Sequence, residues 1–77
     1  MIKQIYDYPL ANPDSADLLT AKDFKNAVKY GMFIDYDGYG RPVKEINGVL
    51  LCTRETICPS RIKEFPEDAT HIEWYNR

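Results

Sequence analysis

The chain has 77 residues, of which 44% are hydrophobic and 29% charged, and its formal net charge is −2. This balance excludes a disordered chain and predicts one small globular domain over residues 1–77. The slight acidic excess and the scattered Lys and Arg residues also exclude the basic stripe that is typical of nucleic-acid-binding proteins.

The N-terminal third is predicted to contain one strand and one long loop. Residues 2–8 alternate loosely between apolar and polar side chains, and their Tyr and Ile residues favour a β-strand that ends at Pro9. Two prolines with Asn, Asp and Ser then predict a loop over residues 11–15.

The clearest element is a helix over about residues 21–30. Thr20 is a typical N-cap, and Leu19 and Phe24 have the spacing of a hydrophobic staple around it. Gly31 follows the last turn, where a left-handed residue commonly ends a helix.

After this helix the hydrophobic period changes to two, which indicates β-strands. The expected elements are a strand over 32–36, a turn over 37–40 whose glycines are free to take positive φ, a strand over 43–46, a hairpin turn at Asn47-Gly48 and a strand over 49–53. The strand over 49–53 is apolar throughout, so we expect it to be central in the sheet and covered on both faces, or covered on one face with a partner on the other.

A short helical turn and one more strand complete the chain. A proline at a first helical position predicts the helical turn near residues 59–64. Residues 70–75 alternate cleanly, so Ile72 and Trp74 should point into the core. The sum is an α+β fold, in which the main helix packs on one face of a small, mostly antiparallel sheet. The last strand is expected at a sheet edge, where it would favour pairing into a homodimer. A second copy could also cover the apolar strand over 49–53.

Few groups are suited to catalysis. His71 is the only histidine, and no spacing pairs it with a nucleophile such as Ser60, Cys52 or Cys58. A catalytic site also needs convergent groups in a pocket, for which a chain of about 80 residues leaves little room. We therefore expect no enzyme, no catalytic residue and no cofactor.

A metal site is not predicted either. Asp35 and Asp37 share one strand face, but an EF-hand loop that began at Asp35 would have Tyr39 and Ile46 at two ligand positions. The gap between the two cysteines fits no zinc knuckle and no redox pair. No apolar run approaches the roughly 20 residues of a membrane span, and the first residues lack the apolar core of a signal peptide. We thus expect a cytoplasmic protein without membrane association, whose thiols are reduced, with a disulfide as the alternative.

Tyrosine is frequent, with six residues in the chain. Trp, Tyr and Arg dominate the hot spots of protein interfaces, although tyrosines in a small core are often half-buried with a wet hydroxyl. Tyr39 lies between two glycines and is expected to be exposed. The residues predicted to bind a partner are Tyr36, Tyr39, Arg41, His71, Glu73 and Tyr75.

The second half of the chain, residues 31–77, combines a glycine turn with a distinctive ending. Its characteristic segments are Phe33, Asp37-Gly38-Tyr39-Gly40, Pro59-Ser60, Pro66 and Thr70-His71-Ile72-Glu73-Trp74-Tyr75-Asn76-Arg77. In these segments the chain resembles small bacteriophage- or prophage-encoded proteins of unknown function. The resemblance implies a bacterial or phage cytoplasm and an accessory role, and it transfers no active residues.

Three classes of function follow, in this order. The leading hypothesis is a small non-enzymatic phage or prophage accessory protein that binds and modulates a host or phage protein; a defence inhibitor such as an anti-CRISPR protein is one version. The alternative is a single-stranded nucleic-acid-binding module that stacks bases on a Tyr-rich sheet face. The acidic balance disfavours it, because phosphate contacts drive such binding. An enzyme or metal protein comes last.

Overall fold

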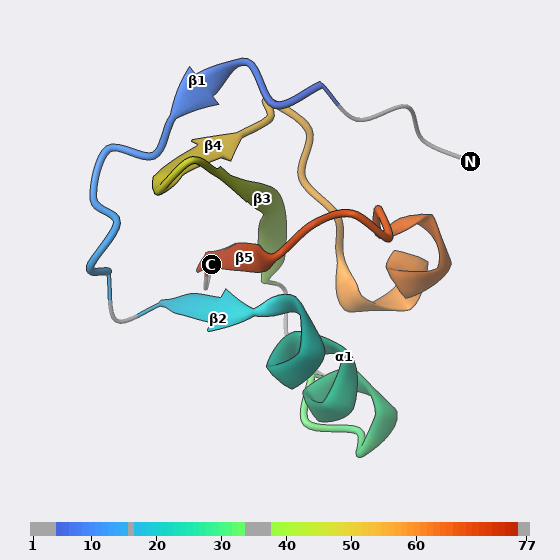
Figure 1. Ribbon diagram of the computed structural model, residues 1–77. Helices are drawn as coiled ribbons and strands as arrows, with labels where there is room; N and C mark the ends of the chain where they lie inside the picture. Colours follow the sequence, from blue (N-terminus) through green and yellow to red (C-terminus); the bar gives the residue numbers. More distant parts are fainter. Residues whose placement is uncertain (1–4, 16, 34–37, 76–77) are drawn as a thin grey trace.

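A computed structural model describes residues 5–15, 17–33 and 38–75 of the chain. It shows a five-stranded antiparallel sheet with one main helix and one short 3-10 helix (Figure 1). The elements in chain order are β1 (Tyr8–Pro9), β2 (Leu18–Thr20), α1 (Ala21–Lys29), β3 (Tyr39–Ile46), β4 (Val49–Cys52), η1 (Pro59–Glu64) and β5 (His71–Tyr75). The predicted α+β class, the main helix and the helical turn at 59–64 are confirmed.

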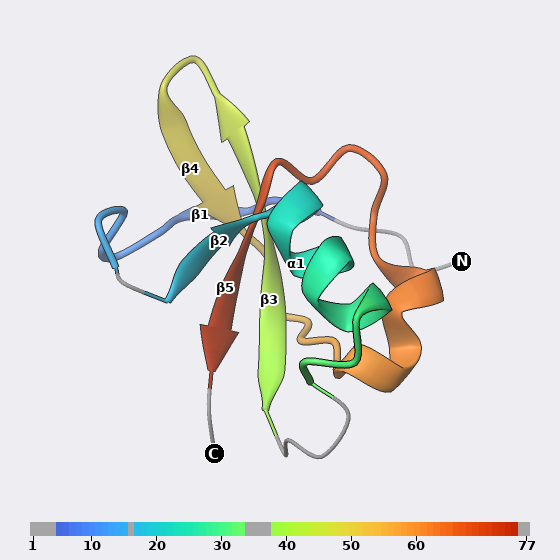
Figure 2. The same cartoon turned by 90° about the horizontal axis from the view of Figure 1, so that it is seen from below.

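The strand order is β1-β4-β3-β5-β2. Figures 1 and 2 show that the sheet is curled, with α1 and η1 on one side and the connection between β1 and β2 on the other. The last strand, β5, lies between β3 and β2, so its predicted edge position is wrong. The reason is that Leu18–Thr20, which had no predicted strand, pairs with β5 and takes the edge. The homodimer prediction loses this edge strand but keeps its other ground, the apolar strand over 49–53, and it stays a prediction.

The helix begins and ends as predicted. Thr20 Oγ1 accepts a hydrogen bond from the backbone N–H of Asp23 at 3.1 Å, which satisfies one of the free donors of the first turn. At the other end Gly31 has φ 77°, and the N–H of Met32 donates to the carbonyl of Ala27 at 2.9 Å. This six-residue wrap is the Schellman motif.

The strand predicted over 32–36 is wrong in its described part. Met32 and Phe33 form a turn, and the remaining residues lie outside the described chain. The Schellman motif turns the backbone here, and the ring of Phe33 packs into the core instead. Its centroid lies 5.5 Å from that of Phe24 and 4.5 Å from that of Trp74.

The glycines of the predicted turn over 37–40 have a different role from the expected one. Gly40 is in an extended strand, not in a turn with positive φ, and β3 already begins at the residue that precedes it. A Cβ on Gly38 would overlap the indole of Trp74, and one on Gly40 would overlap Ile72. The two glycines thus make room for β5 side chains.

β3 begins earlier than the strand predicted over 43–46 and therefore contains Pro42, although it is an interior strand. Gly40 exchanges two backbone hydrogen bonds with Ile57, at 2.8 and 2.7 Å. Two residues later, the nitrogen of Pro42 points to the same side of β3. The chain between β4 and Ile57 does not pair with β3 at this position. The absence of an N–H group on Pro42 therefore removes no hydrogen bond between strands.

The β3–β4 hairpin confirms its turn signal, since Asn47 and Gly48 have φ 52° and 80°, as in a type I′ turn. β4 is an interior strand, as predicted, between β1 and β3. The expected cover on both faces is only partial, because Val49 is 46% exposed while Cys52 is buried.

The predicted first strand, over 2–8, is much shorter than expected. Among the described residues it comprises only Tyr8–Pro9, which extends one residue further along the chain than predicted. Pro9 is tolerated because β1 is an edge strand. Tyr6 precedes the strand, and its hydroxyl donates a hydrogen bond to Asp68 at 3.2 Å.

Hydrophobic cores lie on both faces of the sheet. Ile72 and Trp74 are buried, as predicted, in the core beneath α1 and η1. The full set of buried residues in this core is Phe24, Ile57, Phe65, Ala69, Ile72 and Trp74. A smaller core of Leu10, Val43 and Cys52 fills part of the opposite face.

Candidate partner-binding face

β3 and β5 place five of the six predicted partner-binding residues on the sheet face opposite α1. The cross-strand partners are Tyr39 with Tyr75, Arg41 with Glu73, and Val43 with His71; alternate residues of a strand share a face. Tyr36, the sixth residue, lies outside the described chain. Tyr8 of β1 reaches the same face, because it is the partner of Cys52, which is itself the partner of Val43. We call Tyr8, Tyr39, Arg41, Glu73 and Tyr75 the Arg41 face.

An ion pair lies at the centre of this face. Nη1 of Arg41 is 3.7 Å from Oε1 of Glu73, and the two side chains are 26% and 15% exposed. The hydroxyl of Tyr75 donates a hydrogen bond to the same carboxylate oxygen. Glu73 thereby compensates the charge of Arg41, and the centre of the face is close to neutral.

Two tyrosine rings flank the guanidinium. Cζ of Arg41 lies 5.1 Å from the ring centroid of Tyr75 and 5.7 Å from that of Tyr8, both within the range of a cation–π interaction. The Tyr8 hydroxyl donates to the backbone carbonyl of Thr53 at 2.9 Å, which fixes this ring. The result is a row of ring, guanidinium and ring across the strands.

The hydrogen-bonding capacity of Arg41 is not exhausted. A guanidinium has five N–H donors, and the 3.7 Å contact with Glu73 is longer than a hydrogen bond. The buried Nε has no hydrogen-bond partner among the described residues. Burial lowers the pKa of Arg41, but the neighbouring Tyr75, Tyr8 and Cys52 raise it by more, so the side chain stays charged.

The tyrosines of the row remain protonated. Burial raises the pKa of Tyr75 above its ordinary value, and the hydrogen bond and charge of Glu73 raise it further, against the effect of Arg41. Burial also raises the pKa of Tyr8. Both hydroxyls therefore act as hydrogen-bond donors at neutral pH.

The described hydrogen bonds of His71 and Cys58 go to different partners. Nδ1 of His71 is 2.8 Å from the hydroxyl of Thr70. Both cysteines are free: Cys52 is buried, as expected from its apolar run, and Cys58 Sγ lies 3.0 Å from the Ser60 hydroxyl beside η1. The disulfide alternative is therefore not realised.

The described residues contain no group of three or more His, Cys, Asp or Glu side chains that could hold a metal ion. Within the same part of the chain, no helix has the length and apolar character needed to cross a membrane.

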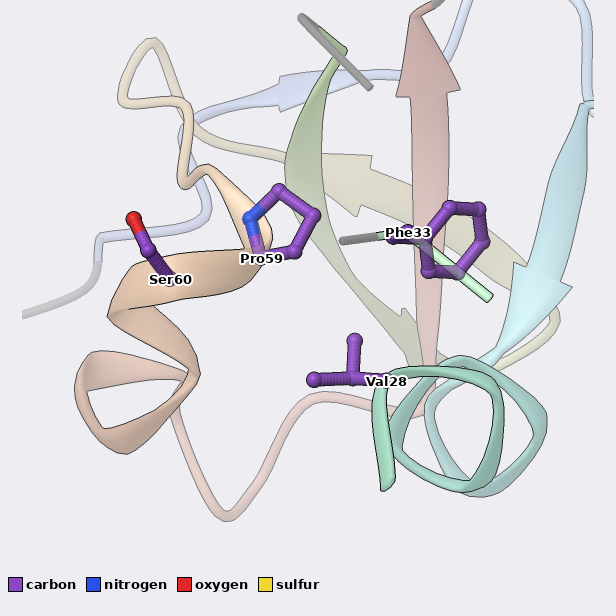
Figure 3. Close-up of a pocket in the computed structure, with 4 residues that line it drawn as sticks. All are labelled: Val28, Phe33, Pro59 and Ser60. Carbon is purple, nitrogen blue, oxygen red and sulfur yellow. The ribbon is translucent and has the colours of Figure 1, made fainter. Parts of the chain in front are cut away.

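A pocket that the sequence did not indicate lies between α1 and η1. It has a volume of about 250 Å³, and its described lining is Val28, Phe33, Pro59 and Ser60 (Figure 3). Val28 comes from α1, while Pro59 and Ser60 come from η1. Since α1 lies opposite the Arg41 face, the pocket and the predicted partner-binding residues are separate surfaces.

Comparisons of the chain with protein-family models, with curated proteins and with solved structures found no match. Any function therefore has to be argued from the surfaces of the molecule.

Proposed function

We propose that this protein is a small non-enzymatic accessory protein of a phage or prophage, which binds and modulates a host or phage protein through the Arg41 face. The phage origin is supported by the resemblance of residues 31–77 alone. The use of this face is supported by its composition and by its position in the fold.

The row of Tyr8, Arg41 and Tyr75 is the observation that carries the proposal. Tyrosine and arginine are the residue types that most often anchor a protein interface. Here they lie on the sheet face opposite α1 and η1, part of which Leu10 covers. Tyr39, 37% exposed at the end of the row beside Tyr75, extends the aromatic surface.

The charge of this face favours a protein over a nucleic acid. Arg41 is the only Lys or Arg that the described strands place on it, and Glu73 compensates that charge. The other strand cation, Lys44, lies on the opposite face, where its Nζ contacts Asp68 at 3.2 Å. Since phosphate neutralisation drives binding to nucleic acids, a stacking surface without free cations supports the alternative function poorly.

A photo-crosslinking experiment tests the proposal. A benzophenone amino acid replaces Tyr39 in the full chain, and the same replacement of Tyr30 is the matched control, because Tyr30 is 76% exposed at the far end of α1. In lysates of candidate bacterial hosts, we expect the Tyr39 position to trap a defined protein that the Tyr30 position does not trap. The purified protein should then bind the wild-type chain. Equal trapping at both positions, or none at Tyr39, would contradict the proposal.

A further inference from the structure

We infer that the segment recognised by the Arg41 face is proline-rich and binds in the polyproline II conformation. This inference rests on the proposed function and specifies the chemistry of its partner. It follows from three properties of the face: its donors, its charge and the spacing of its rings.

The first property is an excess of hydrogen-bond donors. Nη1 of Arg41 approaches the Glu73 carboxylate only to 3.7 Å, on a side chain that is 26% exposed, whereas that carboxylate already accepts from Tyr75. A polyproline II segment suits such a face, because its carbonyl groups make no internal hydrogen bonds and point outward. Each proline also adds an acceptor without adding a donor that would need a partner.

The second property is the charge of the ion pair. An acidic segment would gain the attraction of Arg41, but it would meet the carboxylate of Glu73, whose oxygen lies only 3.7 Å from Nη1. Neutral backbone carbonyls avoid this repulsion and still accept hydrogen bonds from the guanidinium. The compensated pair thus favours an uncharged acceptor.

The third property is the spacing of the aromatic rings. The ring centroids of Tyr8 and Tyr75 lie 5.7 and 5.1 Å from Cζ of Arg41, so the two rings are at most about 11 Å apart. Polyproline II covers that distance with about three to four residues at 3.1 Å each. Proline rings pack well on flat aromatic surfaces, and the preformed helix loses little entropy on binding.

Strand addition, the other common mode for an extended segment, suits this sheet less. Its edge strands are β1, with two residues, and β2, with three. Main-chain pairing along such short edges offers few hydrogen bonds.

Titration of the ¹⁵N-labelled full chain with unlabelled peptides tests the inference by NMR. Decaproline is the probe, a ten-residue Gly-Ser repeat is the peptide control, and ten-nucleotide oligo(dT) is the nucleic-acid control. We expect saturable shifts at Tyr39, Arg41 and Tyr75 with decaproline and at least about fivefold weaker binding of the Gly-Ser peptide. Equal binding of the two peptides, or stronger binding of oligo(dT) at this face, would overturn the inference.

Two variants locate the interaction. Arg41→Lys keeps the charge but removes the planar donor fork, and it should weaken decaproline binding about tenfold. Tyr39→Ala alters an exposed side chain, so it remains informative should Arg41→Lys fail to fold; it should weaken binding at least fivefold. Tyr30→Ala, the control on α1, should change nothing, and an equal loss in this control would count against the site.

The outcomes separate this inference from the proposed function. Specific crosslinking through position 39 without any decaproline binding would leave the proposed function intact and overturn the proline-rich partner. A lack of both would overturn the two together.

Discussion

Gly40 and Ile72 illustrate how single residues set the packing of this sheet. Gly40 lies opposite Trp74 in the β3–β5 ladder, and the side chain of Ile72 occupies the space where a Cβ would stand. A methyl group at Gly40 therefore has to displace a fully buried side chain or the backbone.

We predict that Gly40→Ala lowers the free energy of unfolding by about 1–3 kcal/mol, the usual cost of overpacking a core. Ile72→Val, which removes the overlapping δ methyl group, should cost about 1 kcal/mol alone. The double variant should be less destabilised than the sum of the two, because the smaller side chain relieves the overlap. Urea unfolding of all four proteins measures this coupling, and strict additivity would exclude the proposed overlap.

The phenol of Tyr75 should lose its proton at a higher pH than that of an ordinary tyrosine. Its pKa is raised by burial and by Glu73, whereas in the unfolded chain a tyrosine ionises near pH 10. Since the unfolded state then loses its proton first, the contribution of Tyr75 to stability is present below about pH 10 and declines above it.

The ionisation of the tyrosines can be followed by absorbance. The folded chain should show fewer ionised phenols at about pH 10.5 than the same chain in urea. Tyr75→Phe should reduce the late-titrating fraction, because one such phenol is gone. A variant that keeps the whole late-titrating fraction and loses absorbance change near pH 10 instead would show that Tyr75 is not the protected group.

At the scale of the elements, the N-cap of α1 is a local feature with a global effect. Thr20 both caps the helix and ends β2, where it is the partner of His71. We predict that Thr20→Ala lowers the free energy of unfolding by about 1 kcal/mol, whereas Thr20→Ser, which retains the hydroxyl, costs much less. Thermal unfolding followed by circular dichroism checks both; equal losses would mean that the hydroxyl is not the stabilising group.

The same elements show which parts of the fold could be predicted. The helix, the Asn47-Gly48 turn and the inward direction of Ile72 and Trp74 depend on residues close in sequence, and local patterns predict them well. The sequence does not predict β2, because three residues are too few to show an alternation of apolar and polar side chains. The strand forms by pairing with β5, which lies far away in the sequence. The start of β3 was not predicted, because a proline argues against an interior strand. Pro42 is accommodated only because a segment distant in sequence does not pair with β3 at that position.

Part of the candidate site was also predictable. Period-two alternation places Arg41 beside Tyr39, and Glu73 beside Tyr75, on one face of each strand. The sequence does not reveal that β3 and β5 are neighbours, nor that Tyr8 joins them across β4. Tyr8 is therefore not among the residues predicted from the sequence, although its ring completes the row.

At the scale of the whole molecule, the sheet separates two cores that share the same strands. Leu10, only 7% exposed, closes the smaller core over Val43 and Cys52. Trp74, the only tryptophan in the chain, is buried in the other core. Since both cores stabilise the same ladder, loss of either should unfold the chain as a unit.

We therefore predict that Leu10→Ala lowers the free energy of unfolding by about 2–4 kcal/mol and that Trp74 fluorescence reports this loss from the other side of the sheet. The midpoints of urea unfolding should coincide for fluorescence and far-UV circular dichroism, in the variant as in the wild type. Ile5→Ala, at a side chain 63% exposed, is the matched N-terminal control and should leave the midpoint nearly unchanged. A fluorescence midpoint that stays constant in Leu10→Ala while the circular dichroism midpoint falls would show that the two cores unfold independently.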